Sequence, residues 1–258
     1  MIKPYYETAL GKLYCGDCLK ILPALELNSI DLIFADPPFN VNKPYNDKRK
    51  NYKEWCSEWI IQGFNLLKDT GSFYLMTLTK HLEWKMPIMA KMGVFVNLIV
   101  WKNTTASRCA RQFWLDCQPI MLYGKTDNYK FNRYAEKIIG GQQRWGGYST
   151  EYKGQMKDTW FDIPFVYSGS IRHPEAILKP STNEKACCCQ MPMGLSNRAI
   201  LFSTDKNDIV LDLFSHSGTT AISCEKLNRR WIAIEDKEEY CEIISKRIEK
   251  EISQLKLW

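Results

Sequence analysis

The sequence predicts an α/β fold in which a mostly parallel sheet carries helices on both faces. Short apolar runs alternate along the chain with longer stretches of helical periodicity, an order that favours parallel strands joined by crossover helices. The run at 32–35 is apolar at every position, which is typical of a strand buried on both faces. A strand, a small-residue turn and a helix start follow one another at 208–220, a pattern typical of nucleotide-binding units.

Each predicted element has its own local pattern. Apolar residues at Trp55, Trp59 and Phe64 recur at helical spacing and predict a helix over 53–68, which Gly71 ends. Further helices are predicted from residue 18, at 81–92 with an interruption at Pro87, at 192–203, from residue 219, and at 238–255. The predicted strands are 13–15, 32–35, 72–76, 94–101, 119–123, 208–214 and 231–235.

Residues 125–184 interrupt this regular pattern. They are rich in Gly, Tyr, Asn, Lys and Arg, and irregular segments this long are usually functional or disordered. Basic and aromatic residues interleave there, as at Arg144-Trp145, which suits contacts to phosphates and bases, although a solvated insertion gives the same pattern. We therefore predict two halves of one domain, 1–124 and 185–258, with 125–184 inserted between them.

Charge and composition narrow the class of protein. The chain has 258 residues, of which 45% are hydrophobic and 25% charged, as in globular domains in water. The net charge is +6, and the stretch 102–185 holds 13 Lys and Arg against 8 Asp and Glu, which hints at a polyanionic partner. We see no secretory signal, and the longest apolar stretch, 94–101, is too short to span a bilayer.

The ten cysteines do not predict a metal site. They include one C-x-x-C pair, Cys15 and Cys18, and no second pair that would complete a zinc site. Reduced thiols are the expected state, so we expect a protein of the cytoplasm with no bound metal.

Asp36-Pro37-Pro38-Phe39 directly follows the buried run at 32–35. Asp36 therefore lies at the carboxyl edge of a parallel strand, where open α/β sheets bind their ligands. The two prolines remove two N–H donors and leave carbonyl oxygens that can only accept hydrogen bonds. Rigid acceptors beside a flat ring suit an exocyclic amino group on a planar base. A strand-ending turn with a solvent-facing Asp is the plain alternative.

Acidic residues also lie at or just after the ends of three other strands. Asp212 is near the end of the strand at 208–214, and the small-residue turn Ser215–Thr220 follows it, where backbone N–H groups would point at a ligand. Glu235 ends the next strand, at a position where an acidic residue typically bonds ribose hydroxyls. Asp17 stands between a strand and a helix, where it would either accept a hydrogen bond from a ligand or cap the helix.

These motifs occur in an order that resembles the β-class (permuted) amino methyltransferases of DNA. In that class a D-P-P-Y/F box precedes the target-recognition segment, and the cofactor loop comes last. Here Asp36-Pro-Pro-Phe39 comes first, the basic segment is central, and Asp212-Leu-Phe-Ser-His-Ser-Gly-Thr-Thr220 is near the end. The resemblance implies a Rossmann-like methyltransferase sheet with one antiparallel strand, S-adenosylmethionine as cofactor and double-stranded DNA as partner. Because the class often dimerises, a homodimer is a further expectation.

The resemblance also implies roles for the matching positions. Asp36, Pro37 and Pro38 would orient the target amino group, and Phe39 would stack on the base. Cofactor contacts are expected at Asp17, Cys18, Asp212, Phe214, Ser215, Ser217, Gly218, Thr219, Thr220 and Glu235. Glu235 would hold the ribose and Asp17 the adenine. The stretch 185–192 falls where the class has another cofactor motif, and Gln190 and Pro192 match its Q-x-P ending. DNA contacts are expected at Lys43, Arg49, Lys102, Arg108, Arg111 and Arg144.

The sequence departs from the family pattern at two places. His216 stands where the cofactor loop usually has its first Gly, and a side chain there would crowd the cofactor, force another backbone path or point outward. In addition, Ala186-Cys-Cys-Cys189 replaces a run that usually contains His-Pro.

The implied reaction is direct methyl transfer to the exocyclic nitrogen of a base flipped out of the duplex. Asp in the first box position favours N6 of adenine, N4 of cytosine is the alternative, and RNA ranks below DNA as substrate. A catalytically impaired nucleic-acid-binding relative is a further alternative because of His216. A dinucleotide-dependent oxidoreductase fits less well, since no full G-x-G-x-x-G is present and Asp36-Pro-Pro-Phe39 would have no function.

Overall fold

The computed structural model describes residues 2–41, 48–107, 115–133, 158–160, 163–166, 175–178, 186–187 and 189–255. Of the predicted DNA contacts, Lys43, Arg108, Arg111 and Arg144 lie outside these ranges. Most of the predicted insertion at 125–184 also lies outside them, so its role stays a prediction.

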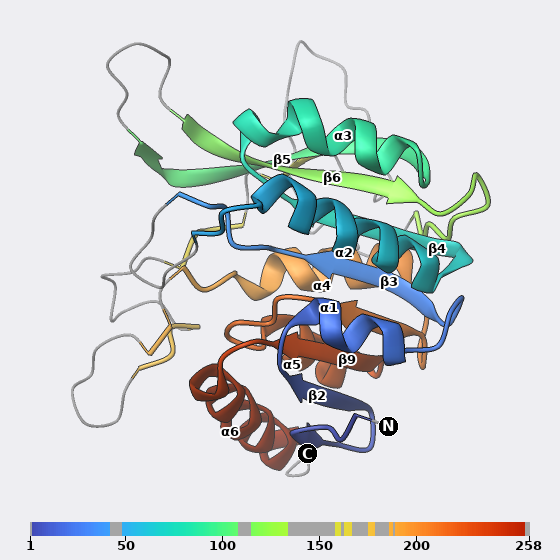
Figure 1. Cartoon of the computed structure of the whole chain (residues 1–258). Coiled ribbons are helices and arrows are strands. Elements are labelled where there is room, and N and C mark those ends of the chain that lie inside the picture. Colours follow the sequence, from blue (N-terminus) through green and yellow to red (C-terminus); the bar gives the residue numbers. More distant parts are fainter. Residues whose placement is uncertain are drawn as a thin grey trace, which may run out of the picture.

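The described strands form one sheet of nine strands in the order β1-β2-β9-β8-β3-β4-β6-β5-β7 (Figure 1). They are β1 (Tyr6–Glu7), β2 (Gly11–Cys15), β3 (Ile30–Ala35), β4 (Leu67–Met76), β5 (Val94–Ser107), β6 (Leu115–Gly124), β7 (Thr159–Trp160), β8 (Ile209–Asp212) and β9 (Arg230–Glu235). The adjacent strands β2, β9, β8, β3 and β4 are parallel throughout, and β5 is parallel to β7.

Strand β6 is antiparallel to both β4 and β5. The α/β fold class predicted from the sequence, a mostly parallel sheet with an antiparallel strand, is therefore confirmed. The short β1 adds a second antiparallel strand, paired with β2 at the sheet edge. Two residues are too few for the sequence pattern to reveal such a strand.

Helices cover both faces of the sheet, as predicted. In Figure 1 the helices α1 and α2 lie in front of the strands and α4 lies behind them. The helices are α1 (Cys18–Ile21), α2 (Tyr52–Leu66), α3 (Leu82–Ala90), α4 (Met193–Ser203), α5 (Thr219–Leu227) and α6 (Glu238–Leu255), with 3-10 turns η1 (Leu22–Ala24) and η2 (Thr79–His81). None of the described helices has both the length and the apolar content needed to cross a bilayer.

Two apolar cores fill the space between the sheet and these helices. Leu32 and Phe34 of β3 belong to the core that includes residues of α4, α5 and α6. Ile33 and Ala35 belong to the other core, which includes residues of α1 and α2. Successive side chains of a strand point to opposite faces, so a fully apolar run is what a strand between two helical layers requires.

The predicted helix at 53–68 ends earlier than expected, and Gly71 has another role. Helix α2 stops at Leu66, and Gly71 lies inside β4. A Cβ at Gly71 would come within 2.9 Å of the Leu67 side chain and 3.1 Å of the Ile30 carbonyl. Gly71 therefore allows close approach of β3 and β4 rather than ending a helix. The predicted interruption at Pro87 is also wrong, because α3 continues through that residue.

Asp31 ties three neighbouring strands together at the end of the sheet away from the predicted site. Its side chain is 4% exposed. Its two carboxylate oxygens accept hydrogen bonds from the Lys68 ammonium on β4 at 2.8 and 2.9 Å. One of them also accepts from the Ile209 backbone N–H on β8 at 2.9 Å. Charge-assisted bonds of this kind are stronger than neutral ones, so Asp31 helps to fix the position of β3 between its neighbours.

Replacement of Asp31 should therefore destabilise the whole sheet. Asp31→Ala leaves the Ile209 N–H and the Lys68 ammonium without their acceptor, so we expect the free energy of unfolding to fall by about 2–3 kcal/mol. Urea denaturation measures this loss. Lys246→Met breaks an exposed helical ion pair with Glu242 and serves as the control, with an expected loss below about 0.5 kcal/mol. Equal losses in the two variants would contradict the role given to Asp31.

Candidate active site

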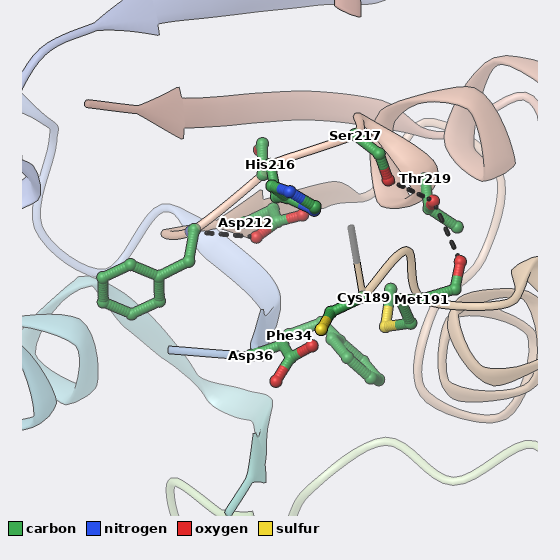
Figure 2. A pocket seen from close by; sticks show the side chains of 10 residues that line it. Phe34, Asp36, Cys189, Met191, Asp212, His216, Ser217 and Thr219 are labelled. Atoms are coloured by element: carbon green, nitrogen blue, oxygen red, sulfur yellow. Dashed lines mark hydrogen bonds between the residues drawn. The ribbon is translucent and has the colours of Figure 1, made fainter. Parts of the chain in front are cut away.

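A pocket lies at the edge of the sheet where β3 and β8 end (Figure 2). Six of its lining residues are positions expected from the sequence, namely Asp36, Asp212, Phe214, Ser215, Ser217 and Thr219. The other four are Phe34, Cys189, Met191 and His216. The fold thus brings the Asp36 motif and the turn after β8 into one pocket, although they are far apart in the sequence.

Strand pairing explains why Asp36 and Asp212 meet. Strands β3 and β8 are parallel neighbours, and Phe34 of β3 is in register with Asp212. Asp36 follows β3 directly, and Asp212 is the last residue of β8. Both carboxyl groups therefore lie at the same edge, which is where open parallel sheets bind ligands. Phe34 and Asp36 are two residues apart, so strand alternation directs both side chains to the same side.

The two carboxyl groups share an unfavourable environment for negative charge. Burial raises the pKa of Asp36 to about 7, and the nearby charge of Asp212 raises it as well. Burial raises the pKa of Asp212 to about 6, even though the Phe214 backbone N–H donates to its Oδ1 at 3.0 Å. A cationic ligand placed between two such groups would favour their ionised forms. The pocket is therefore suited to a ligand that carries positive charge.

The turn after β8 is held by its own hydrogen bonds. The Ser215 N–H donates to the Ile234 carbonyl at 2.9 Å, which anchors the turn to β9. The hydroxyls of Ser217 and Thr219 lie 3.1 Å apart, and Thr219 also donates to the Met191 carbonyl at 3.1 Å (Figure 2). Gly218 has φ +74°, and a Cβ there would come within 2.9 Å of Ile244 on α6. Both facts require glycine at the start of α5.

His216 follows the backbone path that a glycine would take. Its φ is 44°, in the left-handed region that side chains other than Gly rarely adopt. Its N–H donates to the Glu235 carboxylate at 2.7 Å, and its ring packs edge-on against Tyr240 at 4.6 Å. Burial lowers the pKa of His216 to about 4, so the ring is neutral at pH 7. The ring lines the pocket (Figure 2), so it does not point away from it as one alternative expected.

Glu235 is connected to the turn through its carboxylate. The side chain is 6% exposed, and its second oxygen accepts from the Lys237 N–H at 3.1 Å. Burial raises the pKa of Glu235 to about 8. Each carboxylate oxygen has two acceptor sites, so these backbone bonds leave sites for a further donor such as a hydroxyl. The ribose-binding role of Glu235 stays a prediction that this geometry permits.

Asp17 and Cys18 begin α1. The Asp17 Oδ1 accepts from the Leu19 N–H at 3.0 Å, so Asp17 is the N-cap of this helix. A second role in holding adenine stays a prediction. Cys18 is 3% exposed, and burial raises the pKa of its thiol well above the usual range. A neutral, buried thiol at this position packs rather than reacts.

The rest of the Asp36 motif lies beside the pocket rather than in its lining. The Pro38 carbonyl accepts a hydrogen bond from the Tyr52 hydroxyl at 2.8 Å, which ties the motif to α2. Phe39 is partly buried and packs against the core formed with α4, α5 and α6. Its predicted stacking on a base would need this ring to be accessible, and that role stays a prediction.

The segment before α4 contributes two pocket residues, Cys189 and Met191, which the sequence placed in the expected cofactor motif at 185–192 without giving either one a contact. The expected motif residue Gln190 between them is fully buried and holds the chain in place. Its Nε2 donates to the Glu175 carbonyl at 2.6 Å, and its Oε1 accepts from the Ile177 N–H at 3.2 Å. Pro192 is the N-cap residue of α4. The segment with the Q-x-P pattern therefore lies beside the pocket, and its role in cofactor binding stays a prediction.

Two of the predicted DNA contacts lie within the described residues. The Arg49 guanidinium stacks 4.2 Å from the ring centroid of Trp55 and lies 3.7 Å from the Asp236 carboxylate. Arg49 is thus engaged by protein groups near the pocket, because Trp55 in turn packs on Phe214. Lys102 is exposed on β5. For both residues DNA contact stays a prediction.

No cluster of three or more His, Cys, Asp or Glu side chains suited to a metal ion occurs in the part of the chain that the structure describes. The eight cysteines in that part, which include Cys15 and Cys18 of the C-x-x-C pair, are free thiols.

The sheet order and the turn after β8 are those of a Rossmann-like methyltransferase fold. A family described as DNA methylase matches residues 30–246, and the chain belongs to that family. As a member of it, the protein uses S-adenosylmethionine as its cofactor.

Relatives with similar sequences are Type II methyltransferases of bacteria. M.BamHI of Bacillus amyloliquefaciens is 30% identical over 99% of this chain, but the match spans only 61% of that relative. M2.MboI of Moraxella bovis is 31% identical, and the match covers 95% of this chain and 91% of the relative.

Solved structures with the same fold are more distant in sequence. The structure titled PvuII DNA methyltransferase (cytosine-N4-specific) has a TM-score of 0.68 at 19% identity, covering 98% of this chain and 94% of its own. The complex of M1.HpyAVI with S-adenosylmethionine has a TM-score of 0.62 at 20% identity, covering 93% of this chain and all of its own. At these identities the likeness shows the fold.

The residues at the sheet edge fit S-adenosylmethionine. That molecule carries a sulfonium and an ammonium group. Asp212 is buried and Asp36 is partly buried, and a nearby cation would favour the ionised form of each carboxyl. Its ribose carries hydroxyl donors, and Glu235 has acceptor sites left. The hydroxyls of Ser217 and Thr219 add polar groups to the pocket lining.

The positive φ of His216 leads to a stability prediction. His216→Gly should keep the turn, because glycine adopts this conformation without strain. His216→Val should lose about 1–2 kcal/mol relative to His216→Gly, because a β-branched residue fits the left-handed region poorly. Chemical denaturation of the two variants measures the difference, and calorimetry with S-adenosylmethionine tests whether the Gly variant still binds. Equal stability of the two variants would show that residue 216 does not need this backbone conformation.

Proposed function

We propose that this chain is a Type II DNA methyltransferase that transfers a methyl group from S-adenosylmethionine to the exocyclic N6 of adenine. The observation that carries the proposal is that Asp36 lines the same pocket as Asp212 and the turn Ser215–Thr219. Direct transfer requires the catalytic acceptor and the cofactor-binding turn to be neighbours, and the pairing of β3 with β8 supports these roles for Asp36 and the turn. The Type II relatives at about 30% identity support the reaction class.

The chain's own residues would activate the target nitrogen. The lone pair of an exocyclic amino group is delocalised into the ring, so this nitrogen is a weak nucleophile. Hydrogen bonds from its two N–H groups to the Asp36 carboxylate and the Pro37 carbonyl would favour a pyramidal nitrogen with a free lone pair. The Pro38 carbonyl is already engaged by Tyr52. When bound, S-adenosylmethionine supplies a methyl group that is already strongly electrophilic, so positioning and electrostatics account for most of the catalysis.

The remaining roles follow from position. Glu235 would hold the ribose, and Asp17 and Cys18 would lie near the adenine of the cofactor. Phe39 would stack on the target base after it is flipped out of the duplex, because its amino group is inaccessible inside paired DNA. The halves 1–124 and 185–258 together would form the catalytic domain, and residues 125–184 would recognise the target sequence. The Type II relatives also support a protein that acts inside a bacterial cell as the partner of a restriction enzyme.

N4 of cytosine is the second candidate acceptor. The structural likeness to a methyltransferase titled cytosine-N4-specific favours it, whereas Asp at the first position of the motif favours adenine. Both acceptors use the same amino-group chemistry. Mass analysis of nucleosides from DNA methylated by the purified protein separates them, with N6-methyladenine as the expected product.

Removal of the Asp36 carboxylate should abolish the reaction. Asp36→Ala is expected to lower kcat by at least about 100-fold, because the developing charge on the amino group loses its acceptor. Binding of S-adenosylmethionine should change only several-fold, since the turn and Glu235 remain. Transfer of labelled methyl groups to DNA measures the first quantity and calorimetry the second. Asp69→Ala, an exposed carboxylate on β4, is the control. Wild-type turnover in Asp36→Ala would refute the proposed role.

The reaction should also depend on pH through Asp36. Burial raises its pKa to about 7, and only the ionised form accepts the amino protons. Activity should therefore be present above this pKa, and kcat/KM should fall about tenfold per pH unit as the pH drops below it. Asp212→Asn removes a nearby negative charge and should therefore lower the pKa of Asp36. The fall in kcat/KM should then occur at lower pH. A flat profile between about pH 5 and pH 8 would contradict the assignment.

A further inference from the structure

Lys85 on α3 is a buried cation. Neither the fold nor the proposed reaction explains its role. Its side chain is fully buried, with 0% exposure. Within the described part of the chain, its ammonium has no hydrogen-bond partner. An unpaired ammonium is among the most costly groups to bury, so its presence asks for a reason other than stability.

Aromatic rings surround this ammonium. It lies 5.3 Å from the ring centroid of Trp84 and 5.7 Å from that of Tyr52. The two rings also contact each other edge-on at 5.8 Å, and His81 packs on both, at 5.4 Å from Tyr52 and 5.5 Å from Trp84. The negative faces of such rings attract a cation, which holds the ammonium in place without neutralising its charge.

Tyr52 connects this aromatic cage to the Asp36 motif. Its ring faces the Lys85 ammonium, and its hydroxyl donates to the Pro38 carbonyl at 2.8 Å. Through this hydroxyl the cage is hydrogen-bonded to the motif. A shift of Lys85 or of Tyr52 would therefore reach Pro38, which is two residues from Asp36.

Among the titratable groups that the structure describes near Lys85, Asp36 is the one that can carry the opposite charge at pH 7. Burial lowers the pKa of Lys85 to about 8, and Cys56 and Asp36 raise it. Burial raises the pKa of Cys56 to about 11, so that thiol is neutral at pH 7. Burial and Lys85 lower the pKa of His81 to about 4, so its ring is neutral too. Lys85 in turn lowers the pKa of Asp36, against the effects of burial and Asp212.

We propose that Lys85 is a positioning residue for Asp36, whose buried ammonium keeps the Asp36 carboxylate ionised while the Tyr52 hydroxyl fixes the adjoining Pro38. This inference rests on the proposed function, because it assumes that the Asp36 carboxylate accepts the amino protons of the target base. Lys85 itself touches neither base nor cofactor in this scheme. Its effect is electrostatic, through a low-polarity environment where screening by water is weak.

The test compares three variants. Lys85→Met keeps the length of the side chain but removes the charge. The acidic limb of the kcat profile (its fall at low pH) should therefore move up by about one pH unit, with kcat at pH 7 about fivefold lower. Activity should recover as the pH is raised. Lys85→Arg keeps the charge and should keep the limb near its wild-type position. Lys53→Met is the matched control, because the exposed Lys53 ammonium also lies 5.8 Å from the Trp84 ring.

Two further measurements separate positioning from a structural role. The dissociation constant for S-adenosylmethionine should stay within about twofold in Lys85→Met, since the inference places Lys85 outside the cofactor site. The melting temperature should be equal or higher, because an apolar isostere of a buried unpaired charge is neutral or stabilising. A lower melting temperature, or failure to fold, would make Lys85 a structural residue and overturn the inference.

The outcome also distinguishes this inference from the proposed function. If Asp36→Ala abolishes methyl transfer but Lys85→Met keeps the wild-type limb and kcat, the function stands and the role of Lys85 is wrong. If the wild-type protein methylates no DNA, or Asp36→Ala is fully active, the proposed function fails first.

Discussion

The parallel pairing of β3 with β8 is the constraint on which the site depends. It puts Phe34 in register with Asp212, so the residues that follow both strands leave the sheet at one edge. At the other end of the same strands, Asp31 bonds to β4 and to β8 and opposes a slip in register. A slip of one residue would reverse every side chain of β3 between the two cores and move Asp36 away from the turn. The geometry of the pocket is thus secured by contacts well away from it.

Much of this arrangement could be predicted from the sequence because it follows from topology. The apolar run before Asp36 and the small-residue turn after Asp212 each mark a strand end, and parallel strands align their ends. Predictions from the sequence failed where one residue type is compatible with two different local structures. Gly71 can end a helix or allow two strands to approach closely, and only the neighbouring Ile30 carbonyl decides. Phe34 was missed as a pocket residue because an apolar pattern shows burial without showing what is nearby. Cys189 and Met191 were expected only as part of the stretch 185–192.

His216 shows how a departure from a family pattern can be local. His216 stands where the resembled class usually has glycine, and its φ of 44° lies in the region that glycine adopts most readily. Two contacts support the strained residue, the N–H bond to Glu235 and the ring packing on Tyr240. Strain that persists because its surroundings hold it is typical of functional sites. His216 thus combines a left-handed backbone conformation with a ring that lines the pocket.

Buried charge is the property that the pocket and its surroundings have in common. Asp36, Asp212 and Glu235 are all harder to ionise than free carboxyl groups, because burial raises each pKa. A protein optimised for stability alone would replace such groups with apolar ones. Their retention is expected where a positively charged ligand completes the site, since its charge favours the ionised acids. In the proposed reaction Asp36 would have a second requirement, because it would accept protons from a neutral base. A fixed buried cation, the role proposed for Lys85, would meet that requirement without competing for the acceptor oxygens.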